Sequence, residues 1–437
     1  MKIAIIGSGI AGNVVARHLH REHDITVFEA AGHVGGHTHT HSIALDGERH
    51  EIDTGFIVFN DRTYPNFIAL LAELGVESQP SAMSFSVRNE RSGLEYNGTS
   101  FNSLFAQRHN LFRPSFHHML RDILRFNRDA PALLDSAMEI PLGDYLAQER
   151  YSRAFIRDYL IPMGAAIWST DPVRMLSFPA RFFVRFFHNH GMLSVNDRPQ
   201  WRAIRGGSAR YVEKLVAPFR SRIRLNTPIE TVRRLPDGVM VKVRGAEPER
   251  FDQVFLACHA DQALRLLADA TPLERDVVGA FGYQENEAVL HTDTALLPRA
   301  RRAWAAWNYH VAPTQSAATL TYNMNVLQSL KSRHTFCVTL NRTADIAPGR
   351  IIERLTYEHP LYTPAAVVAQ QRQHEVNGVN RTYFCGAYWR YGFHEDGVLS
   401  ALQAVDHLRQ RLAQSDPQLR RSDHFREPRL KVVSHAT

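Results

Sequence analysis

The first thirty residues carry the pattern that most restricts the fold. Lys2 to Ile6 is apolar and predicts a strand, and the run from about Ile10 to His20 predicts a helix. Between them stands Gly7-Ser8-Gly9-Ile10-Ala11-Gly12, and a second strand from Ile25 to Phe28 ends at Glu29. This is G-x-G-x-x-G in the strand–turn–helix–strand context that binds dinucleotides, with an acid where one meets a ribose hydroxyl. The alternative is a glycine-rich turn without a ligand.

Each glycine has a task in binding a pyrophosphate. Gly7 allows the tight turn, Gly9 lets the backbone approach the phosphates, and Gly12 lets the helix pack closely on the strand. Ile10 and Ala11 open the helix, where free N–H groups and the positive helix end attract an anion.

Length and composition narrow the class of protein. The 437 residues suggest two or three folding units, and 44% apolar with 22% charged residues is typical of globular chains. No run approaches 18 apolar residues, and three distant cysteines cannot build a disulfide framework. We therefore expect a cytoplasmic protein.

The chain is basic, with 51 Lys and Arg against 44 Asp and Glu, and only five of the 51 are lysine. A net charge of +7 attracts polyanions such as nucleic acid, an anionic membrane or an acidic substrate. No nucleic-acid-binding motif is present, so we expect no nucleic acid partner. The alternative is an arginine-rich composition without a special partner.

The residues after Glu29 favour FAD over NAD. They contain a Gly-Gly-His-Thr stretch and a later Asp53-Thr54-Gly55-Phe56. This resembles the FAD-binding start of the flavin-containing amine oxidoreductase superfamily, which includes amine oxidases, carotenoid desaturases and protoporphyrinogen oxidases. The arginine that usually ends the first motif is a histidine here, which puts the guanidinium contact in doubt. The resemblance implies FAD contacts from Gly35, Gly36, His37, Thr38, Gly55 and Phe56.

Two later blocks match the same superfamily. Residues 205–208 open a helix and residues 253–258 read as a strand, which would rebuild the dinucleotide fold. Near the C-terminus, a short buried strand at 384–387 precedes a helix that we expect from Asp396. The resemblance implies further FAD contacts from Val232, Gly386, Asp396, Gly397, Val398 and Ala401.

The matching blocks divide the chain into an α/β protein of two parts. Residues 1–80, 201–270 and 381–412 are expected to form a Rossmann-like FAD-binding domain in three separated segments. Residues 81–200 and 271–380 are expected to form an inserted α+β substrate domain, and 413–437 a basic tail.

One helix of the substrate domain is expected to be basic and amphipathic. From Pro114 its apolar residues share one face, and arginines flank them. Such a helix lies on an anionic membrane or packs on its own domain. The face comprises Phe116, Met119, Leu120, Ile123 and Leu124, and the arginines are Arg108, Arg113, Arg121, Arg125 and Arg128.

A second segment is rich in phenylalanine. Its rings form a core or line a pocket for a long apolar substrate. They are Phe178, Phe182, Phe183, Phe186 and Phe187, after Trp168.

The catalytic candidates depart from amine oxidases. His291 stands in the strand nearest to the family's lysine, and Phe393 where a cage tyrosine is usual, and both count against amine oxidation. His394 and Glu395 are the expected proton-handling pair; the alternative is a capping and surface role.

Three further histidines alternate along the chain. On a strand, His37, His39 and His41 would share a face and could bind metal, but their overlap with the FAD motif favours packing. We expect no metal.

The Gly-Gly-His variant, the 161–169 segment and the ending Gly392-Phe393-His394-Glu395-Asp396-Gly397 resemble one bacterial subgroup. Its flavoproteins are typically encoded beside cyclopropane-fatty-acid synthase-like methyltransferases. The resemblance implies FAD-dependent hydride removal from an unsaturated or methyl-branched phospholipid acyl chain, on the inner membrane face, with a methyltransferase as partner. The alternatives are an amine or polyene oxidase, or a flavoprotein that serves the methyltransferase without catalysis.

Overall fold

The beginning, middle and end of the chain meet in one parallel sheet. The computed structural model describes residues 1–136, 139–312 and 317–415. Its five-stranded sheet has the order β10-β2-β1-β14-β20, and all neighbouring strands are parallel. The topology confirms the predicted Rossmann-like α/β class. The strands are β1 (Lys2–Ile6), β2 (Asp24–Phe28), β10 (Ile223–Arg224), β14 (Gln253–Leu256) and β20 (Thr382–Phe384).

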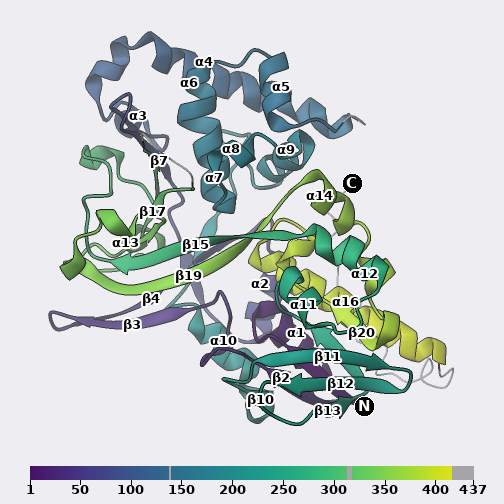
Figure 1. The fold of residues 1–437 in the computed structure, drawn as a ribbon. Coiled ribbons are helices and arrows are strands. Elements are labelled where there is room, and N and C mark those ends of the chain that lie inside the picture. Colours follow the sequence, from purple (N-terminus) through teal and green to yellow (C-terminus); the bar gives the residue numbers. More distant parts are fainter. Residues whose placement is uncertain (137–138, 313–316, 416–437) are drawn as a thin grey trace.

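Helices cover this sheet on one face, and a small sheet with further helices covers the other (Figure 1). The first face carries α1 (Ile10–Leu19), α2 (Pro65–Glu73), α10 (Ala209–Val216) and α16 (His394–Ser415). The second carries β11 (Ile229–Leu235), β12 (Gly238–Val243), β13 (Glu249–Phe251), α11 (Ala260–Leu266), α12 (Pro272–Val277), α14 (Pro364–Gln370) and α15 (Gln373–Val376).

A seven-stranded sheet forms the second large layer. Its order is β19-β15-β18-β17-β16-β7-β8, and only the β16–β7 pair is parallel. The strands are β7 (Phe85–Asn89), β8 (Leu94–Asn97), β15 (Gly282–His291), β16 (Trp307–Val311), β17 (Leu320–Asn323), β18 (Cys337–Leu340) and β19 (Ile351–Leu361), with the short α13 (Met324–Leu327) after β17.

The remaining strands form two small sheets. They are the hairpin β3 (Thr40–Leu45) and β4 (Glu48–Asp53), and the trio β5 (Val58–Asn60), β9 (Trp201–Ile204) and β6 (Ser78–Pro80).

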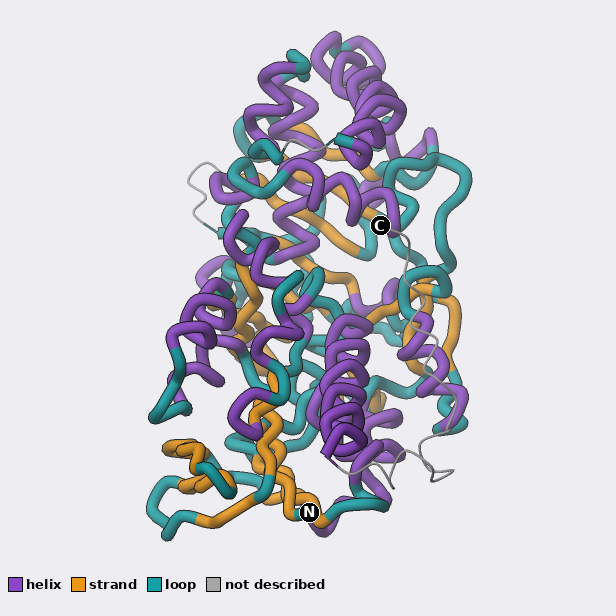
Figure 2. The backbone as a smooth tube through the Cα atoms, turned by 90° about the vertical axis from the view of Figure 1, so that its right-hand side faces the viewer, coloured by secondary structure: helices purple, strands orange, loops and turns teal. Residues whose placement is uncertain are grey.

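A helical lobe stands at the end of the molecule opposite the N-terminus (Figure 2). Its core is rich in aromatic rings, and the five expected phenylalanines are all buried in it. The core interpretation of that segment is therefore confirmed. The helices are α3 (Phe101–Leu104), α4 (Pro114–Asp129), α5 (Leu142–Gln148), α6 (Arg153–Phe155), α7 (Ile161–Trp168), α8 (Pro172–Met175) and α9 (Ala180–Asn189).

The basic amphipathic helix packs on its own domain. In α4, Phe116, Met119 and Phe126 are buried in the core of the lobe, whereas Leu124, predicted for the same face, is 59% exposed. The apolar face is therefore not available to a bilayer, which corrects that prediction for the helix. None of the helices among the described residues is long and apolar enough to cross a membrane. The basic tail lies outside the described residues from position 416 onward.

Candidate functional site

The N-terminal turn has the geometry that its glycines require. Gly7 adopts φ +103°, and a Cβ placed there would lie 2.6 Å from the carbonyl oxygen of Ala257, just after β14. At Gly12 a Cβ would lie 1.9 Å from the Gly7 oxygen, so helix and strand meet without a side chain between them. A Cβ at Gly9 would have no atom within 4 Å. The turn therefore packs tightly against the protein at Gly7 and Gly12, and the space beside Gly9 is open.

Glu29 faces this turn from the end of β2. Its Oε2 accepts hydrogen bonds from the Ser8 amide (2.9 Å) and hydroxyl (2.6 Å), and its Oε1 accepts one from the Ala31 amide (2.8 Å). The acid thus lies beside the turn, as the spacing predicted.

The Gly-Gly-His segment lies across the same turn. The Gly35 amide donates to the Ser8 carbonyl, and a Cβ at Gly36 would lie 3.1 Å from the Gly9 Cα. The Phe56 amide donates to the His37 carbonyl, while a Cβ at Gly55 would lie 2.0 Å from that oxygen. The predicted positions 35–37 and 55–56 therefore meet at the turn.

The start of α16 closes the site. A Cβ at Gly397 would lie 2.7 Å from Ile10 Cγ2, so the two helix starts touch. The Tyr211 hydroxyl lies 2.7 Å from both Thr38 Oγ1 and His394 Nε2, which makes a three-residue hydrogen-bond chain. The His394 ring also stacks on Phe56 at 3.7 Å between ring centroids.

Burial keeps His394 neutral. Desolvation, with a smaller contribution from nearby His37, lowers the pKa of its imidazole to about 3. At neutral pH the ring is therefore an uncharged donor and acceptor.

Glu395 caps another helix, which agrees with the capping alternative, but it is buried and not on the surface. Its Oε1 accepts from the Asn66 amide (3.1 Å) and side chain (2.6 Å), and its Oε2 accepts from the Phe67 amide (2.9 Å), at the start of α2. Burial raises the pKa of this carboxyl to about 7. Both oxygens therefore accept hydrogen bonds from the start of α2.

Asp396 caps its own helix. Its Oδ2 accepts from the amides of Tyr391 (3.1 Å) and Phe393 (2.9 Å), and burial raises its pKa to about 6. An N-terminal carboxylate was expected here, although the helix begins two residues earlier, at His394.

His291 does not belong to this site. His37 contacts His359, which pairs with Gln284 on β15, and His291 lies seven residues further along that strand. At 3.3 Å per residue this is about 23 Å away. Its Nε2 lies 2.7 Å from Thr339 Oγ1, and its Nδ1 accepts from the Asp293 amide. The catalytic prediction for His291 is wrong.

Val232 lies within β11, five residues after the backbone that contacts Glu29. Its carbonyl already accepts from the Ala268 amide, and its side chain is completely buried. The backbone that reaches Glu29 is Thr227, whose amide donates to the Glu29 carbonyl at 2.8 Å. The β11 residue nearest that contact is Ile229, not Val232.

The remaining C-terminal positions support the site from behind. The Gly386 amide donates to the Ser400 hydroxyl, and Val398 and Ala401 are buried in the core between α16 and the parallel sheet. Their side chains shape the start of α16.

Sequence reasoning missed a second group of histidines around His37. Its ring lies 5.7 Å from His259, 5.8 Å from His359 and 5.0 Å from Tyr357. Burial lowers the pKa of His37 to about 4 and that of His359 to about 3. The position of His259 after the carboxyl end of β14 was a usable signal, since ligands bind at that edge of a parallel sheet. His359 lies within a long strand and gave none.

The alternating histidines do not share one face. β3 begins only at Thr40, and His37 turns toward β19, whereas His39 stacks between His33 and His41 at 4.1 Å from each ring. Within the described ranges, no group of three or more His, Cys, Asp or Glu side chains could hold a metal ion.

Asp53 joins two of the matching blocks to Gln328 and was also missed as a site residue. It accepts from Thr40 Oγ1 (2.5 Å), from the Ser208 amide (2.9 Å) and hydroxyl (3.0 Å), and from Gln328 Nε2 (3.1 Å). Burial raises its pKa to about 7. The carboxyl thus fixes β4 against the 205–208 loop.

An aromatic cluster connects the site to the helical lobe. Phe393, beside His394, lies 5.1 Å from Phe186 of α9, and Phe186 lies 4.8 Å from Trp168 of α7. Tyr391 lies 5.4 Å from Phe186 and 4.9 Å from Phe182. These five residues are called the aromatic cluster below.

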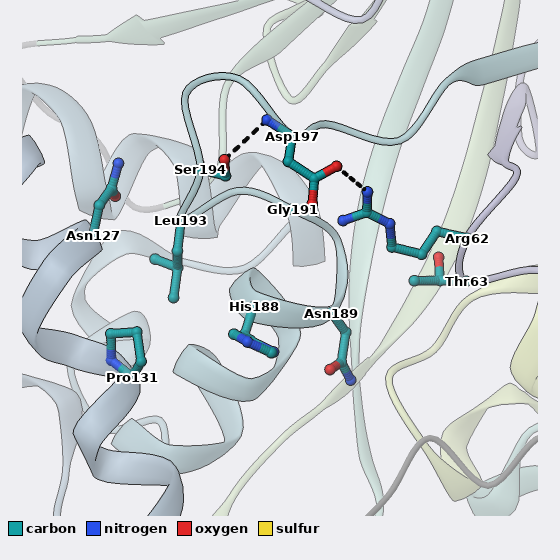
Figure 3. Close-up of a pocket in the computed structure, with 10 residues that line it drawn as sticks. All are labelled: Arg62, Thr63, Asn127, Pro131, His188, Asn189, Gly191, Leu193, Ser194 and Asp197. Atoms are coloured by element: carbon teal, nitrogen blue, oxygen red, sulfur yellow. Dashed lines mark hydrogen bonds and ion pairs between the residues drawn. The ribbon is translucent and has the colours of Figure 1, made fainter.

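A cavity of about 460 Å³ opens beside this cluster. Its wall includes His188, Asn189 and Gly191 (Figure 3), which flank His190, whose ring stacks on Phe186 at 3.8 Å. Arg62 reaches in beside Gly191, where a Cβ would lie 3.2 Å from its guanidinium, and pairs with Asp197 at 2.8 Å (Figure 3).

Comparison with known proteins decides the family. The sequence profile described as flavin containing amine oxidoreductase matches residues 10–295, more than half of the chain. The chain belongs to this family. It is therefore an FAD-dependent oxidoreductase, as predicted. No curated protein sequence matches it significantly.

Solved structures share the fold of this flavoprotein at low sequence identity. Cyclohexylamine oxidase from Brevibacterium oxydans is 16% identical, with a TM-score of 0.67 over 94% of this chain and 99% of that one. Putrescine oxidase bound to putrescine is 14% identical, with a TM-score of 0.65 over 93% and 99%. A fatty acid isomerase from P. acnes that produces CLA is 16% identical, with a TM-score of 0.63 over 94% and 98%.

The residues at the N-terminal turn fit FAD. The open space over Gly9 leaves room for a pyrophosphate at the start of α1, and Glu29 lies where a ribose would follow. In the described part of the chain, the buried Nε2 of His37 has no hydrogen-bond partner, so a polar atom beside the Gly-Gly segment is left for a bound group.

Proposed function

We propose that this flavoprotein desaturates an unsaturated or methyl-branched acyl chain of a phospholipid. The observation that carries the proposal is the aromatic cluster, which runs from the helical lobe to Phe393, next to His394 and the cofactor motifs. Bound FAD supplies the acceptor for a hydride removed from a carbon–hydrogen bond.

The aromatic cluster suits an acyl chain. Trp168 contacts Phe182 and Phe186 in the core of the lobe, and an acyl chain inserted between these buried rings would be held by the hydrophobic effect. Phe393 has no hydroxyl where amine oxidases of the family have a cage tyrosine. This substitution favours an apolar substrate over an amine.

The cavity beside the cluster would receive the polar end of the substrate. Arg62 offers a guanidinium there, and His188 and Asn189, at the end of α9, add hydrogen-bonding groups. A carboxylate or phosphate at this point would compete with Asp197 for Arg62, while the chain would extend past His190 to Phe186.

The Thr38–Tyr211–His394 chain is the proposed path for the proton that leaves with the hydride. Burial disfavours a protonated His394, so the imidazole would accept a proton at one ring nitrogen only as it releases one at the other, and the Tyr211 hydroxyl and Thr38 continue this relay through their hydrogen bonds.

A second candidate is double-bond isomerisation of a fatty acid, favoured by the likeness in fold to the isomerase from P. acnes. Desaturation removes two hydrogens from the substrate, whereas isomerisation returns them. The partnership with a cyclopropane-fatty-acid synthase-like methyltransferase remains part of the proposal, because that enzyme class would supply a methyl-branched chain.

Anaerobic mixing distinguishes these functions. The purified holoprotein is mixed with detergent-dispersed unsaturated or methyl-branched phospholipids, with amines and with polyenes, while flavin absorbance and lipid products are followed. Desaturation predicts flavin bleaching by the phospholipid with stoichiometric loss of two hydrogens. A shifted double bond without bleaching would support isomerisation. Bleaching by amines alone, or by none of the compounds, would overturn the proposal.

A matched pair of variants tests the aromatic cluster. Phe186→Ala removes a ring that links the lobe to Phe393, and we expect bleaching by phospholipid to slow about tenfold. Phe126→Ala removes an equally buried ring of α4 that contacts Tyr145 and Phe155 instead, and should leave the rate within about twofold. Equal slowing in both variants would show that the cluster acts only through stability.

A further inference from the structure

The tip of the helical lobe exposes large apolar side chains. Phe112 is 87% exposed, Phe101 72% and Leu111 39%. They form one surface, because Phe101 contacts Phe105 at 4.8 Å, Phe105 contacts His117 at 6.2 Å, and His117 Nε2 bonds to the Leu111 carbonyl. In Figure 1 this surface lies around α3 and the start of α4, at the end opposite the parallel sheet.

The same surface is strongly basic. Residues 101–121 contain three arginines and three histidines and no acidic residue. A second basic segment, 299–302, lies beside it, because Glu95 of β8 accepts from the amides of Arg299 and Ala300, and Asn97 donates to the Trp304 carbonyl. The exposed basic residues are Arg108, His109, His117, His118, Arg121, Arg299, Arg301 and Arg302.

The acids that interrupt α4 in the sequence do not neutralise this surface. Asp122 is buried, accepts from the Ser152 amide at 2.8 Å and pairs with Arg125. Asp129, at the other end of α4, is paired with Arg128. Arg125 and Arg128 thus pair with acids of the lobe, whereas no ion pair among the described residues involves the exposed arginines of the tip.

We propose that the tip, defined by Phe101, Leu111, Phe112 and the basic residues around them, docks this flavoprotein on an anionic lipid bilayer. The apolar side chains enter the headgroup region, and the arginines bind lipid phosphates. The positive charge alone would attract any polyanion, including a nucleic acid. The exposed Phe101, Leu111 and Phe112 favour a bilayer over a nucleic acid, because apolar side chains can enter the headgroup region. Docking goes beyond the proposed chemistry and does not depend on it.

Vesicle sedimentation tests the surface without turnover. Holoprotein is mixed with dimyristoyl phosphatidylcholine vesicles, with or without phosphatidylglycerol; their chains are saturated and unbranched. We expect binding that requires the anionic lipid and weakens with salt. Leu111→Ser/Phe112→Ser and, separately, Arg121→Glu/Arg302→Glu should each weaken it about tenfold. Flavin content should not change.

The control variants lie on the cofactor-binding half. Val368→Ser removes an apolar residue of α14 that is 61% exposed, and Arg220→Glu reverses an exposed charge; both should bind vesicles like the wild type. Absence of vesicle binding, or equal loss in tip and control variants, would overturn the proposal. So would binding that survives the loss of Leu111 and Phe112 and is displaced by a mixed-sequence RNA. Phospholipid bleaching in detergent reports on the proposed chemistry separately.

Discussion

At the residue scale, the cofactor site depends on places where a side chain is missing. Gly12 and Gly9 stand three residues apart in one turn, yet a methyl group would meet a carbonyl oxygen at the first and open space at the second. A substitution at Gly12 should therefore affect folding, whereas one at Gly9 should affect cofactor binding.

Gly12→Ala is expected to destabilise the apoprotein by about 3 kcal/mol, because the new Cβ would force α1 away from β1. Gly9→Ala should leave the melting temperature of the apoprotein nearly unchanged and reduce FAD affinity, since its Cβ projects into the space above the turn. Thermal unfolding and flavin titration measure both. A Gly9→Ala protein with wild-type FAD affinity would contradict this placement of the pyrophosphate.

His37 is the residue-scale departure from the family pattern. It stands where an arginine is usual, and burial keeps it neutral, so it offers a hydrogen bond and no charge. We expect His37→Ala to weaken FAD binding about tenfold, with little dependence on salt, because no ion pair is lost. Flavin titration at two salt concentrations checks this. A strongly salt-dependent loss would indicate that His37 is charged in the complex.

At the element scale, the start of α16 organises several parts of the molecule. It places His394 against Tyr211 and Phe56, Asp396 against its own first turn, and Glu395 against the start of α2. A carboxylate at a helix N-terminus satisfies free amides, and here it comes from a residue 329 positions away.

The buried carboxyl of Glu395 makes stability depend on pH. Its pKa of about 7 in the folded protein lies above its ordinary value of 4.5, so the folded state binds more protons between these values. Its contribution to the free energy of unfolding is complete below pH 4.5 and is lost as the pH rises through 7. Relative to Glu395→Gln, the wild type should lose up to about 3 kcal/mol between pH 4.5 and 8. Urea unfolding across this range measures the difference, and parallel profiles would contradict it.

At the scale of the whole molecule, FAD binding should tie together three short segments near the two ends of the chain. Residues 7–12, 35–38 and 394–398 approach one another from elements far apart in the chain. Saturating FAD at 100 times its Kd contributes about 2.7 kcal/mol to the folded state.

Removing FAD is therefore expected to lower the melting temperature by several degrees and to speed amide hydrogen exchange in those three segments. Exchange in α4 and α9 should change little, because their apolar faces pack within the helical lobe. Faster exchange throughout the lobe would indicate that the two parts of the molecule fold as one unit.

The sequence alone determined the cofactor and the class of fold. The G-x-G-x-x-G turn and Glu29 are local patterns, since strand, turn and helix are neighbours in the chain and each glycine is required by its immediate surroundings. The parallel sheet then follows from the order of the matching blocks.

Only the tertiary structure decided which polar side chains meet. His291 was placed at the site by its position in a strand, but strand length carries it about 23 Å away. His259 and His359 meet at His37, and Asp53 meets Ser208, through contacts between distant segments that no local pattern encodes. The same holds for the basic surface: sequence shows the arginines, and packing decides which of them face an acid and which face solvent.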